Sequence, residues 1–504
     1  MKIEYTNERC LLVERFLRRN ELEIDNLQAY IPYIDKLKKR RITKWSTIKL
    51  EKRIIEVLKS NPYKGIIADS SGNREKVLFH IKCTPILEPV ALCRNEYTGF
   101  NNHHWLANCN TVKYVYLCNK VNSMKNTAYI DTLCSILLNK LRNEIKTPHF
   151  GNIYGTYSGI YSEYEEEITE EYLSLVSEKW FQRIINNGKY RLKIVNEKKT
   201  DEKQFMTKFL EDNSDNIEVC DLDSYAIEIP ESSIPMKSEM DDDAKYYLVH
   251  PKVPVQIVFM EKFDKTFEDL INDLIYNVRN TQRSVLIRNF RKNMVMNRLR
   301  SWIFQICAGL CCANKNIDFV HNDLHIQNVM GLSTNEKFLY YVKNGVEYKV
   351  PTYGYIMKII DFGRSTYTFN GKYYIGDIFD EDGEAGGQYT TPSCKCFNTN
   401  KEVKPHPAFD LARFACSFVE DLEESIWPTK DNLNEYDIGS LINNWTVNDD
   451  GQSLMDIEGF DLYINIARHF RTRDPYSELD SNIFGRYIKE HSQDEKDSKI
   501  IYDI

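Results

Sequence analysis

The sequence has little glycine and proline, no long hydrophobic run and no excess of basic charge. Gly and Pro account for 21 and 15 of its 504 residues, which excludes collagen-like and low-complexity proteins. The longest apolar run, Trp302 to Ala313, contains a Gln and is too short to cross a bilayer, so we expect no membrane association. A net charge of −8, from 66 basic and 74 acidic residues, argues against a protein that coats nucleic acid.

Cysteines are also few for the length, and they are irregularly spaced. The chain has 13 of them, and its first residues, MKIEYTNERC, carry charges throughout. We therefore expect neither a disulfide scaffold nor a secretory leader, but a soluble protein in a reducing compartment. Hydrophobic residues make up 42% of the chain, which is enough to bury a sizeable core.

The texture of the chain changes along its length. Residues 1–60 have apolar side chains at helical spacing and predict a helical N-terminal extension. Strand and turn patterns dominate residues 61–262, with a helix expected over 127–145 and a charged, irregular insertion at about 160–245 that ends in an exposed loop. Helical patterns then dominate residues 263–490, and a short tail, 491–504, follows.

Two short motifs carry the chemistry. FVHNDLHIQNVM, residues 319–330, contains Asp323 and Asn328, and KIIDFGRS, residues 358–365, contains Asp361. Transfer of a phosphoryl group from ATP needs a carboxylate that orients the acceptor hydroxyl and takes its proton, and hard oxygen ligands that hold Mg²⁺ against the phosphates. Asp323 fits the first role, while Asn328 and Asp361 fit the second. The alternative, ordinary helix-cap and turn residues, would have to explain both motifs at once.

These motifs resemble the catalytic loop, with His321, Asp323 and Asn328, and the metal-binding loop of the protein kinase-like superfamily. The resemblance covers about residues 62–490. It implies an α+β fold of two lobes, a small sheet-containing N-lobe and a mainly helical C-lobe, with ATP and Mg²⁺ between them. Stretches such as FHIKCTPILEP and TPHFGNIYGTYSGI most resemble serine/threonine kinases of large DNA viruses of the iridovirus and mimivirus type, which implies the host cytoplasm or the virion.

The same resemblance implies roles for further residues. VQIVFMEKF is similar to the strand that enters the hinge between the lobes. Met260 then takes the gatekeeper position, and Glu261, Lys262 and Phe263 offer backbone groups to adenine. PAFDLARFA is similar to a long buried helix whose Asp, here Asp410, hydrogen-bonds the backbone of the catalytic loop.

The lysine that grips the α- and β-phosphates has two candidates. Lys82 follows a hairpin that contains Gly65 and Gly72, and it precedes the expected helix. Lys193 follows the spaced glycines of residues 151–159 and is nearer in sequence to the catalytic loop. We favour Lys82, because TPHFGNIYGTY is better explained as the turn and strand that come after the helix of the small lobe.

The sequence departs from the kinase pattern at several positions. Neither set of glycines forms G-x-G-x-x-G, and the helix acid that should pair with the lysine remains open among Asp131, Asn139 and Glu144. Asn322 stands where regulated kinases have an Arg that binds a phosphorylated activation loop, so we expect that switch to be absent.

The acceptor is predicted less firmly than the phosphoryl transfer. His325 replaces the Lys of most serine/threonine kinases, and Asp-Leu-His-x-x-Asn also resembles small-molecule kinases of the aminoglycoside and choline phosphotransferase type. The leading prediction is a serine/threonine protein kinase whose partner is a protein with Ser or Thr hydroxyls. A small-molecule kinase is the first alternative. A nucleotide-binding pseudokinase is the second, favoured by the poor glycine loop and opposed by the intact catalytic residues.

Overall fold

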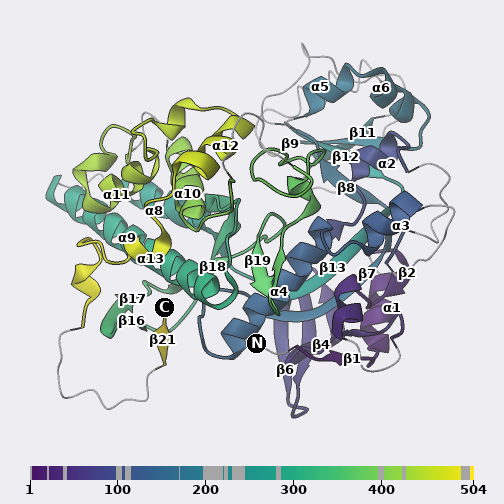
Figure 1. Ribbon diagram of the computed structural model, residues 1–504, viewed down its shortest axis with the longest axis horizontal. Helices are drawn as coiled ribbons and strands as arrows, with labels where there is room; N and C mark the ends of the chain where they lie inside the picture. The colour runs from purple at the N-terminus through teal and green to yellow at the C-terminus, as the bar shows by residue number, and fades with distance from the viewer. Residues whose placement is uncertain are drawn as a thin grey trace.

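The computed structural model describes residues 3–19, 22–37, 42–97, 105–107, 115–169, 171–196, 219–220, 225–229, 244–279, 285–394, 402–422, 427–489 and 500–504. Two lobes lie side by side, a strand-rich lobe built from the N-terminal half and a mainly helical lobe built from the C-terminal half (Figure 1). This arrangement confirms the predicted α+β fold with a small sheet-containing lobe and a helical one.

A six-stranded antiparallel sheet forms the core of the small lobe. Its strands lie in the order β2 (Ile24–Gln28), β7 (Ile153–Tyr161), β13 (Val253–Glu261), β6 (Arg74–Pro85), β5 (Tyr63–Asp69) and β4 (Lys52–Ser60). Strand β13, VPVQIVFME, is central and almost entirely buried, which explains why its sequence is a continuous apolar run rather than an alternating one.

Each face of this sheet is covered by one helix. On one face Val258 and Ile160 belong to the same core as α4 (Thr127–Asn143), whose first turn is capped by the side chain of Asn126. On the other face Val255, Ile257 and Phe259 pack with apolar residues of α1 (Leu11–Arg19). The sheet thus holds α4 beside β6, the strand that carries Lys82.

The first 60 residues, predicted to be helical, are only partly so. They contain α1 and the 3-10 helix η1 (Pro32–Leu37), but also β1 (Tyr5–Thr6), β2, β3 (Thr47–Ile48) and β4. Strands β4 and β2 form the two edges of the main sheet. Strand β2 pairs with the distant β7, and β4 forms a hairpin with β5, the next strand; helical spacing within the segment reveals neither pairing.

The stretch predicted as an insertion contains a second sheet with its own apolar core. The strand order is β10 (Val219–Cys220), β11 (Tyr225–Ile229), β9 (Arg191–Asn196), β12 (Ala244–His250) and β8 (Tyr164–Glu167). Helices α5 (Tyr172–Val176) and α6 (Lys179–Asn186) pack on it through Tyr172 and Phe181. Of the exposed loop expected before residue 245, residues 225–229 form β11, while 230–243 lie outside the described residues.

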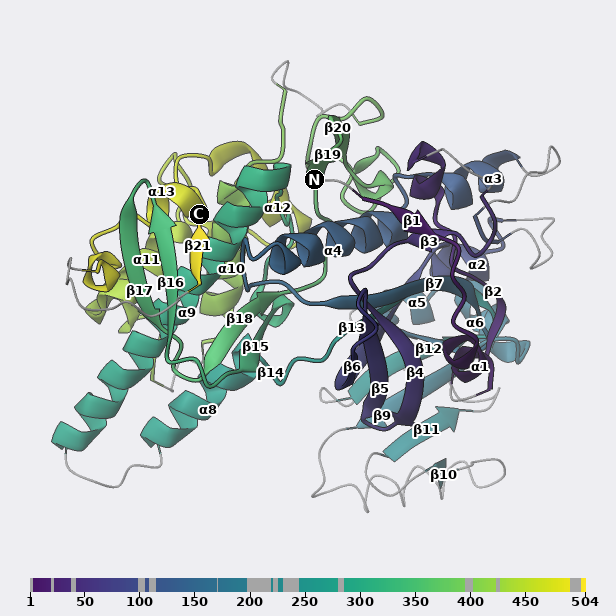
Figure 2. The same ribbon diagram turned by 90° about the horizontal axis from the view of Figure 1, so that it is seen from below.

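The large lobe is built around the long helix α9 (Val285–Ile317), whose apolar run from Trp302 to Ala313 is buried. Five further helices accompany it: α8 (Phe267–Arg279), α10 (Ala408–Glu420), α11 (Asp437–Trp445), α12 (Phe460–His469) and α13 (Pro475–Glu478). Figure 2 shows α8 and α9 projecting together from this lobe, away from the small lobe. Within the described ranges, no helix is both long and apolar enough to cross a membrane.

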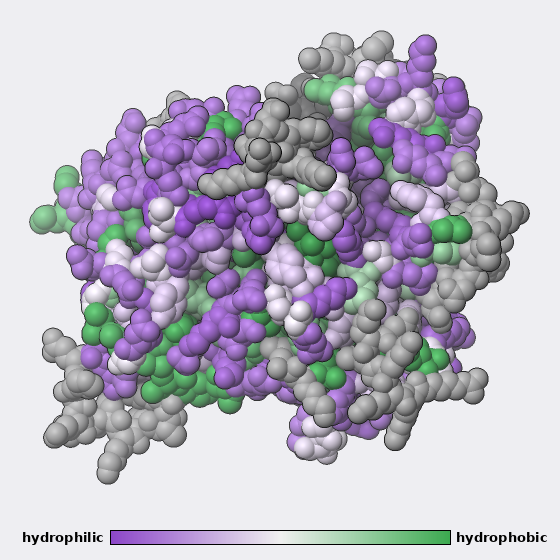
Figure 3. Space-filling view, in the orientation of Figure 1, coloured by the Kyte–Doolittle hydropathy of each residue, from purple (hydrophilic) through white to green (hydrophobic). Residues whose placement is uncertain are grey.

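Short strands join the helices of the large lobe. One sheet orders β14 (Lys265–Thr266), β15 (Val329–Ser333) and β18 (Tyr355–Ile359); a second orders β17 (Val346–Pro351), β16 (Phe338–Lys343) and β21 (Ile501–Asp503); a third pairs β19 (Tyr367–Phe369) with β20 (Lys372–Tyr374). The face drawn in Figure 3 is mostly hydrophilic, with apolar side chains gathered at the lower edge of this lobe.

Candidate active site

The loop between α9 and β15 carries the first motif, and α10 holds it in place. The buried carboxylate of Asp410 accepts hydrogen bonds from the backbone N–H groups of His321 and Asn322, each at 2.9 Å. Burial raises the pKa of Asp410 to about 6, although the two N–H donors and His321 favour its charged form. The contact predicted for Asp410 is therefore present, and it fixes the backbone immediately before Asp323.

Strand pairing brings the two motifs together. Strands β15 and β18 are antiparallel, with Val329 opposite Ile359, and the N–H of Ile360 donates to the carbonyl oxygen of Asn328 at 3.0 Å. Asn328 comes just before β15 and Asp361 just after β18, so the pairing places them next to each other at one end of this small sheet. Asp361 has a φ of 64°, a left-handed conformation that residues other than glycine rarely adopt.

Asn328 and Asp361 fit a magnesium ion. The side-chain amide nitrogen of Asn328 lies 2.9 Å from the carbonyl oxygen of Asp323 and 2.9 Å from Nε2 of His325, which leaves its amide oxygen turned the other way. The side chain of Asp361 is 52% exposed. In the described parts of the chain no three His, Cys, Asp or Glu residues form a metal cage. Mg²⁺ is usually held by one or two protein oxygens together with substrate phosphates, which suits this pair.

Lys82 forms ion pairs with two carboxylates, one in each lobe. Its Nζ lies 2.9 Å from Oδ2 of Asp131, on α4, and 3.0 Å from Oδ1 of Asp361. Burial opposes the charge of Lys82, but the two carboxylates outweigh it and raise the pKa of the ammonium group. The ammonium in turn holds the pKa of Asp361 well below its usual range. An ionised lysine is thus fixed beside the candidate metal ligand.

The structure also separates the candidates for the helix acid. Besides meeting Lys82, the buried Asp131 accepts a hydrogen bond from the backbone N–H of Phe362 at 2.9 Å. Asn139 instead accepts from the N–H of Ile153, and Glu144 follows the last turn of α4. Asp131 therefore links α4, the lysine strand and the Asp-Phe-Gly segment.

Lys193, the second candidate for the phosphate lysine, lies in a different part of the small lobe. It is on β9, in the second sheet, and its Nζ lies 3.0 Å from Oε1 of Glu165 on β8, which is separated from β9 by β12. The structure does not bring it to Asp361.

The turn between β4 and β5 lies where a phosphate-covering loop would be needed. Lys64 pairs with Leu78, so the antiparallel register sets the Asn61–Pro62 turn beside Ile81 and Lys82. The two predicted glycines lie elsewhere. Gly65 is inside β5, where a Cβ atom would come within 2.7 Å of the backbone oxygen of Glu56, and Gly72, with a φ of 84°, is in the turn between β5 and β6.

Residues predicted to meet adenine lie at the end of β13, where the chain passes to the large lobe. Met260 is partly buried and Phe263 is buried. The ring of Phe263 lies so close to Gly151 that a Cβ atom on residue 151 would be 2.9 Å from it. The N–H of Glu261 donates to the carbonyl oxygen of Asn152 at 2.9 Å, so it is already used. A ligand at this segment would have to use its other backbone groups.

The side chain of Glu261 is engaged as well. Its carboxylate forms a two-pronged ion pair with Arg142 at the end of α4, with 3.2 Å between Nη2 and Oε1. Burial opposes this charge, but Lys358 and Arg142 together lower the pKa of Glu261. The connection between the lobes is thus tied to the end of α4.

Asn322, where an Arg was expected, organises the segment after the Asp-Phe-Gly. Its Nδ2 donates to the carbonyl oxygen of Arg364 at 3.0 Å, and its Oδ1 accepts from the hydroxyl of Tyr389 at 2.7 Å. Both contacts are neutral hydrogen bonds between buried or partly buried groups. The segment therefore has an anchor at this position that requires no phosphate.

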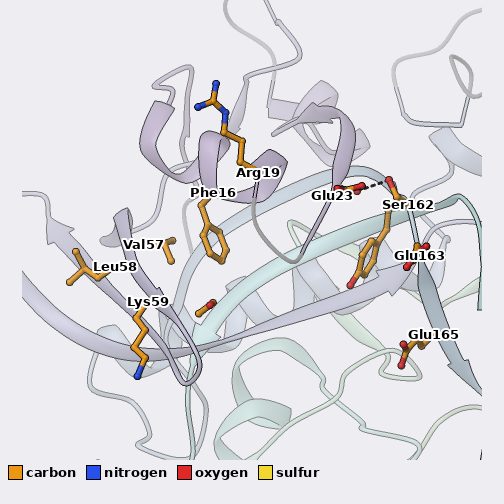
Figure 4. A pocket seen from close by; sticks show the side chains of 11 residues that line it. Phe16, Arg19, Glu23, Val57, Leu58, Lys59, Ser162, Glu163 and Glu165 are labelled. Atoms are coloured by element: carbon orange, nitrogen blue, oxygen red, sulfur yellow. Dashed lines mark hydrogen bonds between the residues drawn. The ribbon is translucent and has the colours of Figure 1, made fainter. Parts of the chain in front are cut away.

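A pocket in the small lobe lies apart from these residues. It is bordered by α1, the end of β4 and the beginning of β8, and Figure 4 shows Phe16, Arg19, Lys59 and Glu163 around it. Neither Asp323, Asp361 nor Lys82 lines it. We therefore assign the chemistry to the motif residues and not to this pocket.

Comparison with known proteins gives partial matches. No family model matches the chain. It is 37% identical over 83 residues to the serine/threonine-protein kinase haspin of Mus musculus and 38% identical over 84 residues to that of Bos taurus, in each case 16% of this chain and 11% of the relative. It is 38% identical over 71 residues to the uncharacterized protein 098R of Invertebrate iridescent virus 6, or 13% of this chain and 12% of the relative. The chain thus spans only about a ninth of the length of these relatives.

Among solved structures, the chain is similar to ROP2 from Toxoplasma gondii, described as a virulence factor with a protein-kinase fold and no enzymatic activity. The TM-score is 0.28 and the identity 9%, over 95% of this chain and 88% of that one. The partial matches to haspin and the two-lobed topology are consistent with a kinase-like fold.

Proposed function

We propose that this chain is an ATP-dependent phosphotransferase that acts on serine or threonine hydroxyls of proteins. The observation that carries the proposal is the position of the Lys82 ammonium, 2.9 Å from Asp131 and 3.0 Å from Asp361. Asp361 lies on a loop that strand pairing sets beside Asn328. Such a group, with Asp323 on the adjoining loop, has the parts that phosphoryl transfer needs. The partial matches to haspin support a protein acceptor, and the match to the iridescent-virus protein supports the proposed relation to proteins of large DNA viruses.

In this proposal each residue has one task. Lys82 binds phosphate oxygens, and Asn328 and Asp361 hold Mg²⁺, which neutralises charge on the phosphates. Asp323 orients the acceptor hydroxyl and accepts its proton while the hydroxyl oxygen bonds to the γ-phosphorus and the bond to the departing ADP oxygen breaks. Asp131 contacts both Lys82 and the backbone N–H of Phe362, and so fixes their positions relative to each other.

The test is incubation with labelled ATP and Mg²⁺, with a mixed protein extract in one arm and a panel of small alcohols in the other. We expect label on protein Ser or Thr residues, and a rate lower by about 10²- to 10⁴-fold with Asp323→Asn. Label on a small alcohol alone would favour the small-molecule kinase, for which His325 beside Asn328 is the supporting observation. Nucleotide binding without transfer to either would favour the pseudokinase.

A further inference from the structure

A tyrosine from a distant helix touches the proposed catalytic base. Tyr463, on α12, donates a hydrogen bond from its hydroxyl to Oδ1 of Asp323 at 2.7 Å, although 140 positions separate the two residues. The same hydroxyl oxygen accepts a hydrogen bond from Nε of Arg413, on α10, at 2.9 Å. A chain of two hydrogen bonds thus runs from Arg413 through Tyr463 to Asp323.

The ring of Tyr463 is held on several sides. Its centroid lies 6.0 Å from that of Phe409 and 6.0 Å from that of Phe460, which stacks on it. The guanidinium groups of Arg364 and Arg413 lie 5.4 Å and 5.3 Å from the ring centroid. Aromatic packing and two cation–π contacts restrict the ring, so its hydroxyl has a defined position.

Charge determines which way the proton points. Burial and the negative charge of Asp323 both raise the pKa of Tyr463, so the phenol stays protonated at neutral pH. Arg413 has only donors, so the oxygen of Tyr463 accepts from it and the phenol proton is free to bond Asp323. The direction of the relay is therefore from the arginine to the carboxylate.

We propose that Tyr463 is a positioning residue for Asp323, supported by Arg413; this inference rests on the proposed function. With Oδ1 occupied by Tyr463, the carboxylate is held in one rotamer and presents Oδ2 to an acceptor hydroxyl. Oδ2 lies 3.7 Å from Nε of Arg364, which is longer than a direct hydrogen bond. Among the described residues Oδ2 is therefore the oxygen of Asp323 to which we assign the acceptor hydroxyl, with Arg364 beside it.

Tyr463 itself is a poor phosphate acceptor. Its oxygen already accepts from Arg413, and its ring is clamped between Phe409 and Phe460 on a helix, so the oxygen cannot advance toward a γ-phosphorus. This distinguishes a positioning residue from a site of self-phosphorylation, and the two assignments give different products.

The test compares Tyr463→Phe with wild type in steady-state kinetics of the intact chain. Loss of one hydrogen bond to a charged group should lower kcat by about 10- to 100-fold. KM for ATP should stay within about twofold, because the lysine and metal residues are untouched. Tyr476→Phe, which removes a hydroxyl bonded to Asn344 in another part of the large lobe, is the matched control and should keep full activity. Arg413→Lys should retain more activity than Arg413→Met.

A second readout asks whether Tyr463 acts through Asp323. When Asp323 is already replaced by Asn, Tyr463→Phe should cause hardly any further loss of kcat. A variant that disrupts the fold would lower kcat in both the wild-type and the Asp323→Asn backgrounds. Full kcat in Tyr463→Phe, or equal losses in the two backgrounds, would overturn the positioning role. Phosphate found on Tyr463 by mass spectrometry after incubation with Mg²⁺ and ATP would overturn it as well.

Thermal unfolding of wild type, Tyr463→Phe, Asp323→Ala and the double variant needs no turnover. We expect these two substitutions to be non-additive in their effect on Tm, because either one removes the same hydrogen bond, whereas Asp323→Asn would keep an oxygen that accepts it. Additive shifts would show that the contact is absent and would overturn the inference. If the shifts are non-additive but the wild type transfers no phosphate, the contact is present and the proposed function is overturned.

Discussion

At the residue scale, each side chain proposed for the reaction already has a protein partner that orients it. Tyr463 donates to Asp323, His325 meets the amide of Asn328, and Lys82 pairs with Asp361. Side chains that are held in place before a ligand arrives lose little entropy when they bind it. These residues are therefore largely fixed in the positions from which the proposed reaction would proceed.

Asp323→Asn should remove the base and keep the shape of the side chain. We expect kcat to fall by about 10²- to 10⁴-fold, the usual contribution of a positioned general base. Because Asp323 is 23% exposed at the cleft, Tm should change little. Phosphate transfer by purified variant and wild type, measured with a protein acceptor, decides the matter: equal rates would contradict the role of Asp323.

The two candidate lysines form a natural pair of variants. Lys82 and Lys193 are both strand residues, each side chain is 25% exposed, and each Nζ forms an ion pair near 3 Å. Lys82→Met should abolish transfer, because Asp131 and Asp361 would lose their shared cation. Lys193→Met should leave most activity. The same transfer assay on both variants is the check, and the opposite result would move the phosphate site to β9.

At the scale of elements, the segment that follows the Asp-Phe-Gly is anchored to the small lobe. The hydroxyl of Tyr367 in β19 donates to the carbonyl oxygen of Ile130 in α4 at 3.1 Å, and Lys125 pairs with Asp380 at 3.1 Å. The ring of Tyr33, in η1, lies 5.7 Å from that of Phe369. These contacts join the segment to α4 and to the N-terminal region without a phosphate group.

This anchoring predicts that activation-loop phosphorylation is not needed. Asn322 cannot form the charge-assisted pair that an Arg makes with a phosphate, so a phosphate on Tyr373 or a neighbouring residue should add little order. Protein treated with phosphatase should be as active as untreated protein. A drop of tenfold or more, about 1.4 kcal/mol, would show that another cation orders the segment.

At the scale of the whole molecule, His149 joins the two lobes. It follows α4, is fully buried, and lies 2.9 Å from the carbonyl oxygen of Met357 and 2.8 Å from the hydroxyl of Tyr341, both in the large lobe. The carbonyl oxygen of Met357 can only accept a hydrogen bond, so Nδ1 of His149 carries the proton and Nε2 accepts from the hydroxyl of Tyr341. Burial lowers the pKa of His149 to about 3, so the neutral ring is the folded form.

This pKa predicts a loss of stability in mild acid. The unfolded chain takes up a proton at His149 as the pH falls below 6.5, whereas the folded protein does so only near 3. Stability from this residue is therefore complete above pH 6.5 and falls toward pH 3, by at most about 1.4 kcal/mol per pH unit. His149→Gln should lower Tm at pH 7.5, and its deficit relative to wild type should shrink at pH 4.5. His469→Gln, at a 45% exposed position, is the control; a deficit independent of pH would contradict this account.

Much of the fold could be predicted from the sequence because its signals are local. The hairpin of β5 and β6, the buried run of α9 and the helix after residue 127 follow from patterns of neighbouring side chains, whereas the second sheet, within the stretch predicted to be irregular, does not. The strands within residues 1–60 could not be predicted so readily. For β2 and η1, partners far along the chain decide the packing: β2 joins β7, and the 3-10 helix η1 contacts β19.

For the site, the sequence alone determined the residue types that carry the chemistry, because Asp323, Asn328 and Asp361 lie in two short motifs whose spacing is read directly along the chain. Only the tertiary structure decided which of the three candidates meets Lys82. Asp131 and Asn139 lie at different heights on α4 and Glu144 follows its end, so the packing of α4 against the sheet determines which of them lies beside Lys82. Only the tertiary structure brought Tyr463 to Asp323 as well. A contact between residues 140 positions apart leaves no trace in local spacing, because it depends on how α12 packs against α10 and the catalytic loop.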